Sequence, residues 1–337
     1  MRSSRIGGAG ALAGALVLCA FEPWAPPPDA QPAVEIVATG ISRPLQLALD
    51  GRILVVLSPG TRGDTAAEIS RVDLEGELPV DLARQPALRI PFAQHAAATL
   101  GSLAIPSGSR DLYLGEENGA RIFRMGEDGR LVLYATGLTR LAGSGGLSFD
   151  AEGRLLVIDY VFDPRAHGAE DRPPPGLEQF KDEDYRGPLV FRLTLDPQIP
   201  LPRRLASLAP LFPRGWGGRK GGGMLPRLLA VAPLAGGDLL LLGSGGHLYR
   251  LTSDGAFTFF ARLPTAQYDR ISMVTDRQGG AYVSGGFHTG RVFHVSPAGA
   301  VTTVASGLAD PEGIVPDGRG WLYVAESAQH RVIRLRP

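Results

Sequence analysis

A short sequence unit recurs along this chain and constrains its fold more than any other feature. Its last copy, residues 301–337, reads VTTVASGLADPEGIVPDGRGWLYVAESAQHRVIRLRP. Residues 321–325 are apolar on both alternating faces, which is typical of a strand covered on both sides. Residues 331–336 alternate polar and apolar side chains, which indicates a half-buried strand. Asp317-Gly318 predicts a tight turn before these strands, because glycine accepts a positive φ angle.

Weaker copies of this unit predict its length. Residues 34–47 (VEIVATGISRPLQL) align with residues 301–314, and residues 131–138 align with the start of both. A turn followed by a short apolar strand recurs, and these strands are marked by Val55, Leu114, Val157, Leu241, Val283 and Val324. Three of the intervals between successive markers are 41, 42 and 43 residues long. Repeats of about 40–45 residues with about four strands each are typical of propeller blades.

The longest interval decides the number of blades. It spans 84 residues, from Val157 to Leu241, which leaves a seventh, degenerate blade open. Only one recognisable strand, residues 189–195, lies inside it, and this strand matches the third strand of a blade, so six blades are favoured. The flanking stretches at about 163–186 and 197–227 are irregular, and we expect them to form insertion loops over the mouth of the channel.

The two ends of the sequence predict how the ring closes. The last unit stops after its third strand, and residues 34–38 match the missing outer strand. We expect residues 34–38 to pair with the strand around residues 331–336, because closure removes exposed sheet edges. The predicted fold is an all-β, six-bladed β-propeller that forms a single domain over residues 34–337.

The first 33 residues have a different composition. Arg2 and Arg5 precede an apolar run at residues 6–21, and a proline-rich tether follows. This pattern predicts a secretory leader and hence an exported protein, periplasmic or extracellular, with an uncleaved anchor or acylation at Cys19 as alternatives. Contact with a membrane is expected only through these features. Cys19 is the only cysteine, so we expect no disulfide and no thiolate metal site in the mature protein.

The charge balance argues against a nucleic-acid partner. The chain has 34 Lys and Arg residues and 34 Asp and Glu residues, so its formal net charge is zero. Proteins that bind nucleic acids need a basic surface to contact phosphates. The expected partner is therefore a small molecule or a protein.

Ligands of propellers bind where the inner strands open at the mouth of the central channel. The positions just before the inner strands are Gln46, Ser102, Gly146, Ala230, Ser272 and Glu312. The positions on the loops after the adjacent strands are Ser58, Glu117, Asp159, Ser244, Ser284 and Glu326. The predicted ligand-binding residues among them are Gln46, Glu117, Asp159, Ser272, Glu312 and Glu326.

Two side chains are candidates for catalysis, Glu312 and His288. Histidine titrates near neutral pH and can act as a general base. Both residues also have a structural interpretation, because Glu312 can bond the amides of its own turn and His288 can lie in a surface turn. The same holds for other polar candidates. Asp159 and Glu326 can connect the turns of the blades, and Glu116-Glu117 can form a solvated turn.

Residues 310–327 (DPEGIVPDGRGWLYVAES) resemble the repeat of the NHL and SMP-30/gluconolactonase-like six-bladed propellers. The resemblance covers nearly all of the chain after residue 33 and implies a fold rather than an activity. It implies that a lactonase-type divalent cation would be held by Glu, Asn and Asp side chains from inner positions of several blades. Glu312 matches one such position and is the candidate metal ligand. A hard cation such as Ca²⁺ needs several oxygen ligands, so a full metal site is not expected.

A second resemblance involves residues 34–56, with ATGISRP at 38–44, and GPLVFR at 187–192. These segments are similar to soluble quinoprotein glucose/sorbosone dehydrogenases, which implies pyrroloquinoline quinone on top of the propeller and a histidine base. The implied histidine would fall in residues 103–107, which contain none. The implied Arg-Asn pair is replaced by Leu225-Pro226-Arg227.

The functional prediction follows from these observations. We expect an exported propeller that binds a small molecule or a protein partner at the mouth of its channel. The alternative is a diverged enzyme of the same fold, either a pyrroloquinoline quinone-dependent sugar dehydrogenase or a lactonase that uses a divalent metal such as Ca²⁺.

Overall fold

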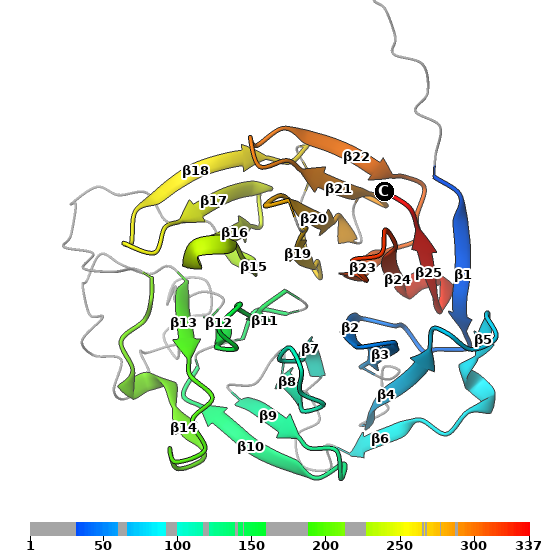
Figure 1. Ribbon diagram of the computed structural model, residues 1–337, viewed down its shortest axis with the longest axis horizontal. Helices are drawn as coiled ribbons and strands as arrows, with labels where there is room; N and C mark the ends of the chain where they lie inside the picture. Colours follow the sequence, from blue (N-terminus) through cyan, green and yellow to red (C-terminus); the bar gives the residue numbers. More distant parts are fainter. Residues whose placement is uncertain are drawn as a thin grey trace, which may run out of the picture. The chain divides into compact units, whose positions relative to one another are not determined.

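Six sheets follow one another around a ring, in the order of the sequence (Figure 1). The computed structural model describes residues 32–59, 66–91, 100–116, 121–138, 141–143, 145–159, 188–212, 227–264, 266, 268–276, 278–286 and 289–337. All of these residues belong to one compact unit, Gln31–Pro337. The prediction of a six-bladed β-propeller is confirmed.

The first three blades contain the following strands. Blade 1 consists of β2 (Gln46–Asp50), β3 (Ile53–Ser58), β4 (Ala66–Asp73) and β6 (Leu88–Pro91). Blade 2 consists of β7 (Leu100–Ala104), β8 (Leu112–Glu116), β9 (Arg121–Met125) and β10 (Leu131–Thr136). Blade 3 consists of β11 (Leu147–Phe149), β12 (Leu155–Asp159) and β13 (Leu189–Leu193), and a single bridge from Val190 to Phe212 stands where the other blades have an outer strand.

The remaining blades are more compact in sequence. Blade 4 consists of β15 (Leu228–Pro233), β16 (Leu239–Gly243), β17 (His247–Leu251) and β18 (Phe257–Arg262). Blade 5 consists of β19 (Met273–Thr275), β20 (Ala281–Ser284), β21 (Val292–Val295) and β22 (Val301–Ala305). Blade 6 consists of β23 (Pro311–Pro316), β24 (Leu322–Glu326), β25 (Arg331–Leu335) and β1 (Val34–Thr39).

Burial within a blade decreases from the second strand outward, and this gradient explains the sequence pattern. Strands β12 and β16 are buried along their whole length, because neighbouring blades cover both of their faces. Half of the residues of the outer strand β18 are exposed. Apolar clusters join consecutive blades, and Val37, Leu54 and Tyr323 belong to the cluster that joins blade 6 to blade 1. The core is therefore a closed series of contacts between blades.

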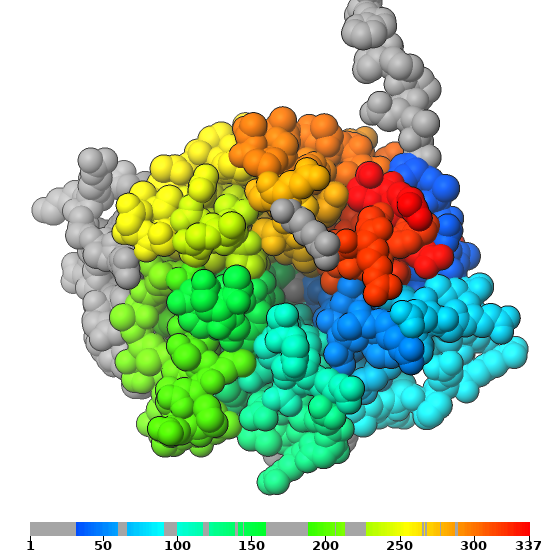
Figure 2. Space-filling model, viewed as in Figure 1, coloured from blue at the N-terminus to red at the C-terminus, as the bar shows by residue number. Residues whose placement is uncertain are grey.

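The ring closes as predicted. β1 pairs antiparallel with β25, with Val34 opposite Leu335 and Ala38 opposite Val332. The blue N-terminal strand and the red C-terminal strands lie side by side in Figures 1 and 2. Val37 and Ala38 are fully buried in this junction. The strand predicted around residues 189–195 is β13, the third strand of blade 3, which also agrees with the prediction.

Two short edge strands were not predicted. β5 (Val80–Asp81) adds to β1 in parallel, and β14 (Arg203–Arg204) adds to β10 in parallel (Figure 1). Each leads into a 3-10 turn, η1 (Leu82–Arg84) or η3 (Leu205–Ser207). The prediction of an irregular insertion over residues 197–227 is therefore wrong for residues 203–207. The outer edges of β1 and β10 offer unpaired backbone groups, and pairing with a passing segment satisfies them.

Gly40, at the end of β1, is placed so that only glycine fits. Its φ is +72°, and a Cβ there would lie 2.7 Å from both the Ala83 amide nitrogen and Asp81 Oδ1. Gly307 occupies the same place after β22 with the same φ of +72°, but a Cβ there would meet nothing within 4 Å. The two glycines therefore share the same φ angle and differ only in that an edge strand packs against Gly40.

We expect Gly307→Ala to cost about 1 kcal/mol of unfolding free energy, from backbone strain alone. Gly40→Ala is expected to cost roughly 2–3 kcal/mol, because it also displaces β5 and η1. Urea unfolding of both variants measures the difference. Equal costs would show that the edge strand does not contact β1 as described.

Candidate functional site

A cavity of about 420 Å³ lies at the end of the ring where the inner strands of blades 5, 6 and 1 begin. We call it the rim cavity. Its lining residues are Arg43, Asp269, Arg270, Asp310, Glu312, Ser327, Ala328 and His330. Glu312 lies in β23, and the others come from the turns that precede β2, β19 and β23 and from the turn between β24 and β25. The volume is within the range of small-molecule sites.

The backbone around the rim cavity has an unusual conformation. Four non-glycine residues in the described part of the chain have a positive φ: Arg43 at 51°, Arg270 at 48°, Asp310 at 50° and His330 at 53°. All four line this one cavity. The left-handed region is unfavourable for residues with a Cβ, and such strain gathers at functional sites. The first three share the turn that leads into an inner strand, whereas His330 ends the 3-10 turn η6 (Ser327–Gln329).

Backbone contacts hold these turns against one another. The Arg43 amide donates to His330 Nδ1 over 3.1 Å. The Ile41 amide donates to the His330 carbonyl over 3.3 Å, and the Ser327 amide donates to the Asp310 carbonyl over 3.2 Å. The turns that carry Arg43 and His330 are therefore held together across blades 1 and 6, and the turn that carries Asp310 is held within blade 6.

Glu312 supplies a buried carboxylate to the rim cavity. Its residue exposure is 3%, and Ser327 Oγ donates to its Oε1 over 2.7 Å. Ser327 begins η6, so this bond joins the start of β23 to the end of β24. The rim cavity thus combines one anchored carboxylate with two arginines, two aspartates and a histidine.

Two other predicted residues, Gln46 and Ser272, line a separate cavity of about 240 Å³ between the inner strands. We call it the channel cavity. β23 has a register irregularity between Pro311 and Ile314, whereas β2 pairs with β3 without a shift. Such irregularities redirect side chains. Glu312 consequently lines the rim cavity, while Gln46, the predicted equivalent in blade 1, lines the channel.

Glu326 lies next to the rim cavity but does not line it. Its Oε2 is 2.6 Å from Arg331 Nε, and its Oε1 accepts from the Ala309 amide over 2.9 Å. Glu326 therefore ties β24, β25 and the turn before β23 together, in line with its structural interpretation. Asp159 is buried at the end of β12 and lines neither cavity.

Blade 2 contains a similar pair of a glutamate and an arginine, but the glutamate is Glu116 rather than the predicted Glu117. Glu116 is 1% exposed, and it accepts from Arg121 Nε and Nη2 over 2.7 and 2.6 Å. The interpretation of Glu116 as part of a solvated turn is therefore wrong, because its carboxylate is buried in an ion pair. Glu117 and His288 lie outside the described residues, as does the whole of the stretch 163–186.

The residues of the rim cavity do not fit a lactonase-type cation. Among the described residues, no three His, Cys, Asp or Glu side chains gather as a metal-binding group. Asp269, Asp310 and Glu312 all line the cavity, but they do not gather as the set of oxygen ligands that a hard cation requires.

Sequence reasoning missed Arg43, Arg270, Asp310 and His330. A signal for two of them exists, because Arg43-Pro44 and Asp310-Pro311 occupy the same place in the aligned repeats. Nothing in the alignment indicates that His330, from a different turn, meets them.

In sequence, the chain matches no family model and no curated protein. In structure, a gluconolactonase from Xanthomonas campestris aligns over 91% of this chain and 95% of its own length, with 15% identity and a TM-score of 0.54. A calcium-binding regucalcin from Agrobacterium tumefaciens aligns over 90% and 94%, with 12% identity and a TM-score of 0.54. Virginiamycin B lyase from Staphylococcus aureus aligns over 90% and 84%, with 12% identity and a TM-score of 0.52. The predicted resemblance to gluconolactonase-like six-bladed propellers is thereby confirmed at the level of the fold.

The predicted leader, with Cys19, lies outside the described residues. Within the part that is described, no helix is both long and apolar enough to cross a membrane.

Proposed function

We propose that the protein is an exported β-propeller that binds a small polar molecule in the rim cavity. One observation carries the proposal: the four left-handed residues Arg43, Arg270, Asp310 and His330 converge on the cavity that holds the buried Glu312. Strained backbone at four separate positions is retained more readily where side-chain placement matters for binding. The export component rests on the composition of residues 1–33.

The lining indicates the chemistry of the ligand. Arg43 makes no ion pair with another described residue, and a guanidinium group binds carboxylates through two parallel hydrogen bonds. Glu312 and Asp310 provide acceptors for hydroxyl or amino groups. We therefore favour a small molecule that carries a carboxylate together with hydroxyl or amino groups, such as a hydroxy acid or an amino acid.

Catalysis at the same site is the second candidate function. The observation that favours it is the burial of Glu312 beside Ser327, because a carboxylate held in a cavity is suited to act as a general base. This alternative predicts turnover of a sugar lactone, or oxidation of a sugar in the presence of pyrroloquinoline quinone.

Calorimetry on the full chain tests the proposal, with D-gluconate, L-malate and L-glutamate as probes and with Ca²⁺ and pyrroloquinoline quinone for the enzymatic alternative. We expect at least one of the three acids to bind. Arg43→Ala should weaken this binding at least tenfold, which corresponds to about 1.4 kcal/mol, and Glu312→Gln should weaken it as well. Arg319→Ala is the control, since Arg319 is exposed in the β23–β24 turn at the opposite end of blade 6.

The proposal fails if none of the three acids produces a binding heat, or if Arg43→Ala binds as tightly as the unmodified protein. Turnover that disappears in Glu312→Gln would instead establish the enzymatic alternative.

A further inference from the structure

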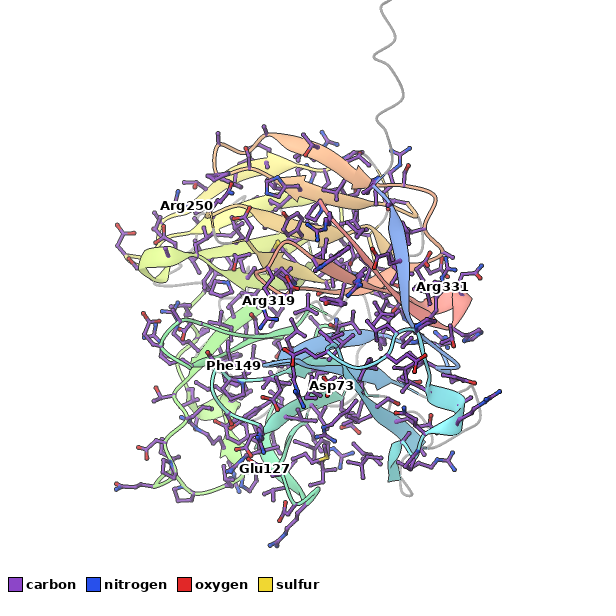
Figure 3. The ribbon with its side chains drawn as sticks, turned by 45° about the vertical axis from the view of Figure 1, so that its right-hand side comes forward. Asp73, Glu127, Phe149, Arg250, Arg319 and Arg331 are labelled. Carbon is purple, nitrogen blue, oxygen red and sulfur yellow. The ribbon has the colours of Figure 1, made fainter. Side chains whose placement is uncertain are left out.

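A set of ion pairs lies on the face of the ring opposite the rim cavity. In blades 2, 3 and 4, a carboxylate in the turn between the first two strands pairs with an arginine on the third strand. The pairs are Asp111–Arg124 at 2.8 Å, Asp150–Arg192 at 3.2 Å and Asp238–Arg250 at 2.7 Å. Figure 3 labels Arg250 on blade 4. The three arginines stand at the same register, opposite Tyr113, Leu156 and Leu240 of the adjacent second strands.

Blade 5 has a histidine in this position. His294 stands opposite Tyr282, and its Nε2 lies 2.6 Å from Asp276 Oδ2. Asp276 Oδ1 accepts from the Gln278 and Gly280 amides over 2.7 and 2.8 Å. Burial opposes ionisation of Asp276, but the hydrogen bonds from His294, Gly280 and Gln278 hold its pKa below the ordinary value.

This arrangement sets the proton on the imidazole ring. An ionised carboxylate can only accept hydrogen bonds, so Nε2 carries the proton toward Asp276. In the neutral ring Nδ1 is then a hydrogen-bond acceptor. Among the described residues, Nδ1 has no hydrogen-bond partner, and the ring lies against Tyr282 with the two centroids 4.9 Å apart. An arginine at this position has no acceptor to offer.

A cavity of about 340 Å³ opens beside the pair, between blades 5 and 6. We call it the interblade cavity. Its walls include the rings of Tyr282 and Trp321, and its polar lining includes Thr275, Gln278 and His294. Arg334 and Arg336 stack on the Trp321 ring, with guanidinium carbons 4.4 and 4.3 Å from its centroid. The cavity therefore combines fixed aromatic rings with an oriented acceptor.

We propose that the interblade cavity binds a neutral, hydroxylated ring of monosaccharide size. The apolar face of such a ring suits the Tyr282 ring, whereas the Trp321 ring, already covered by Arg334 and Arg336, only closes the wall of the cavity. Its hydroxyls can donate to His294 Nδ1 and bond with Gln278 and Thr275. Two carboxylates line the cavity, Asp276 and Asp317, and both accept hydrogen bonds from backbone amides. Arg334 is already paired with Glu35 at 2.6 Å. A neutral ligand with hydroxyl donors is therefore favoured over an anion.

The interblade cavity and the rim cavity lie at opposite ends of the blades, so the two sites are independent. The first is formed by the turns β19–β20 and β23–β24, and the second by the turns that precede β19 and β23. A failure of one proposal leaves the other intact.

The decisive variant is His294→Arg, which restores the residue type of blades 2, 3 and 4. It should keep the pair with Asp276 and the fold, while removing the acceptor nitrogen. Thermal unfolding and calorimetry on the full chain use glucose, galactose, mannose, fucose, N-acetylglucosamine and myo-inositol as probes. At least one of them should raise the Tm of the unmodified protein and of Glu312→Gln, and His294→Arg should weaken its binding at least tenfold.

Gln278→Ala is the second variant, because Gln278 is exposed and its replacement should not affect folding. It should weaken the same probe about threefold. The proposal is overturned if no probe binds, or if His294→Arg or, should that variant not fold, Gln278→Ala leaves the affinity unchanged. It is also overturned if Glu312→Gln abolishes binding, because the sugar would then occupy the rim cavity.

Discussion

A chain that begins at Gly40 is expected to lose its closed ring, whereas one that begins at Gln31 should keep it. The difference is β1, which supplies the outer strand of blade 6 and carries β5 on its other edge. Its removal uncovers the edge of β25 and deprives the cluster around Leu54 and Tyr323 of the buried Val37. We expect a loss of at least about 5 kcal/mol, comparable with the whole net stability of a domain.

Urea unfolding followed by circular dichroism measures this loss, and light scattering reports association through the uncovered strand edge. A permuted chain provides the control. Residues 34–39 joined after Pro337 by a short glycine linker should restore the stability, because β25 and β1 are antiparallel and Leu335 already lies opposite Val34. Equal urea midpoints for the chains that begin at Gln31 and Gly40 would show that β1 does not close the ring.

Removal of the Glu326 carboxylate is expected to have the second largest effect. Glu326→Ala leaves the Ala309 amide and the Arg331 guanidinium without their acceptor. Loss of one partner from a buried pair costs roughly 3–5 kcal/mol. The Arg331 side chain, labelled in Figure 3, is 31% exposed and can regain water, so we expect about 2–3 kcal/mol here.

A double-mutant cycle with Arg331→Ala isolates the ion pair from the bond to Ala309. The Glu116–Arg121 pair of blade 2 has two hydrogen bonds where the Glu326–Arg331 pair has one, so its coupling energy should be at least as large. Glu75→Ala is the exposed control, since Glu75 pairs with Arg52 at the surface, and it should cost less than about 0.5 kcal/mol. A cost as small for Glu326→Ala would contradict the structural role assigned to that residue.

Most of the blade architecture could be predicted because its determinants are local. The second strands are apolar on both faces, and glycine turns separate them, so the repeat and its length are visible in the sequence. The edge strands β5 and β14 were missed because they have only two residues each. The shared sequence Leu-Pro-x-x-Leu-Ala at residues 78–83 and 201–206 is a signal that an internal comparison could have used.

The candidate site could be predicted only in part. Glu312 was selected from its place in the repeat, and the structure does put it in a cavity. Gln46 was selected by the same rule but lies in the channel cavity, because the β23 irregularity has no counterpart in β2. A pattern of period two cannot show a one-residue irregularity, yet such an irregularity redirects every polar side chain near it.

The sequence by itself favoured six blades and determined the order of their strands and the closure by residues 34–38, because each depends on a repeated local pattern. Only the tertiary structure decided which side chains share a cavity. Arg43, Arg270 and His330 are far apart in the chain, and they meet because the ring brings blade 1 beside blade 6 and blade 6 beside blade 5. The special position of His294 is likewise visible only when strand register aligns it with the arginines of the other blades.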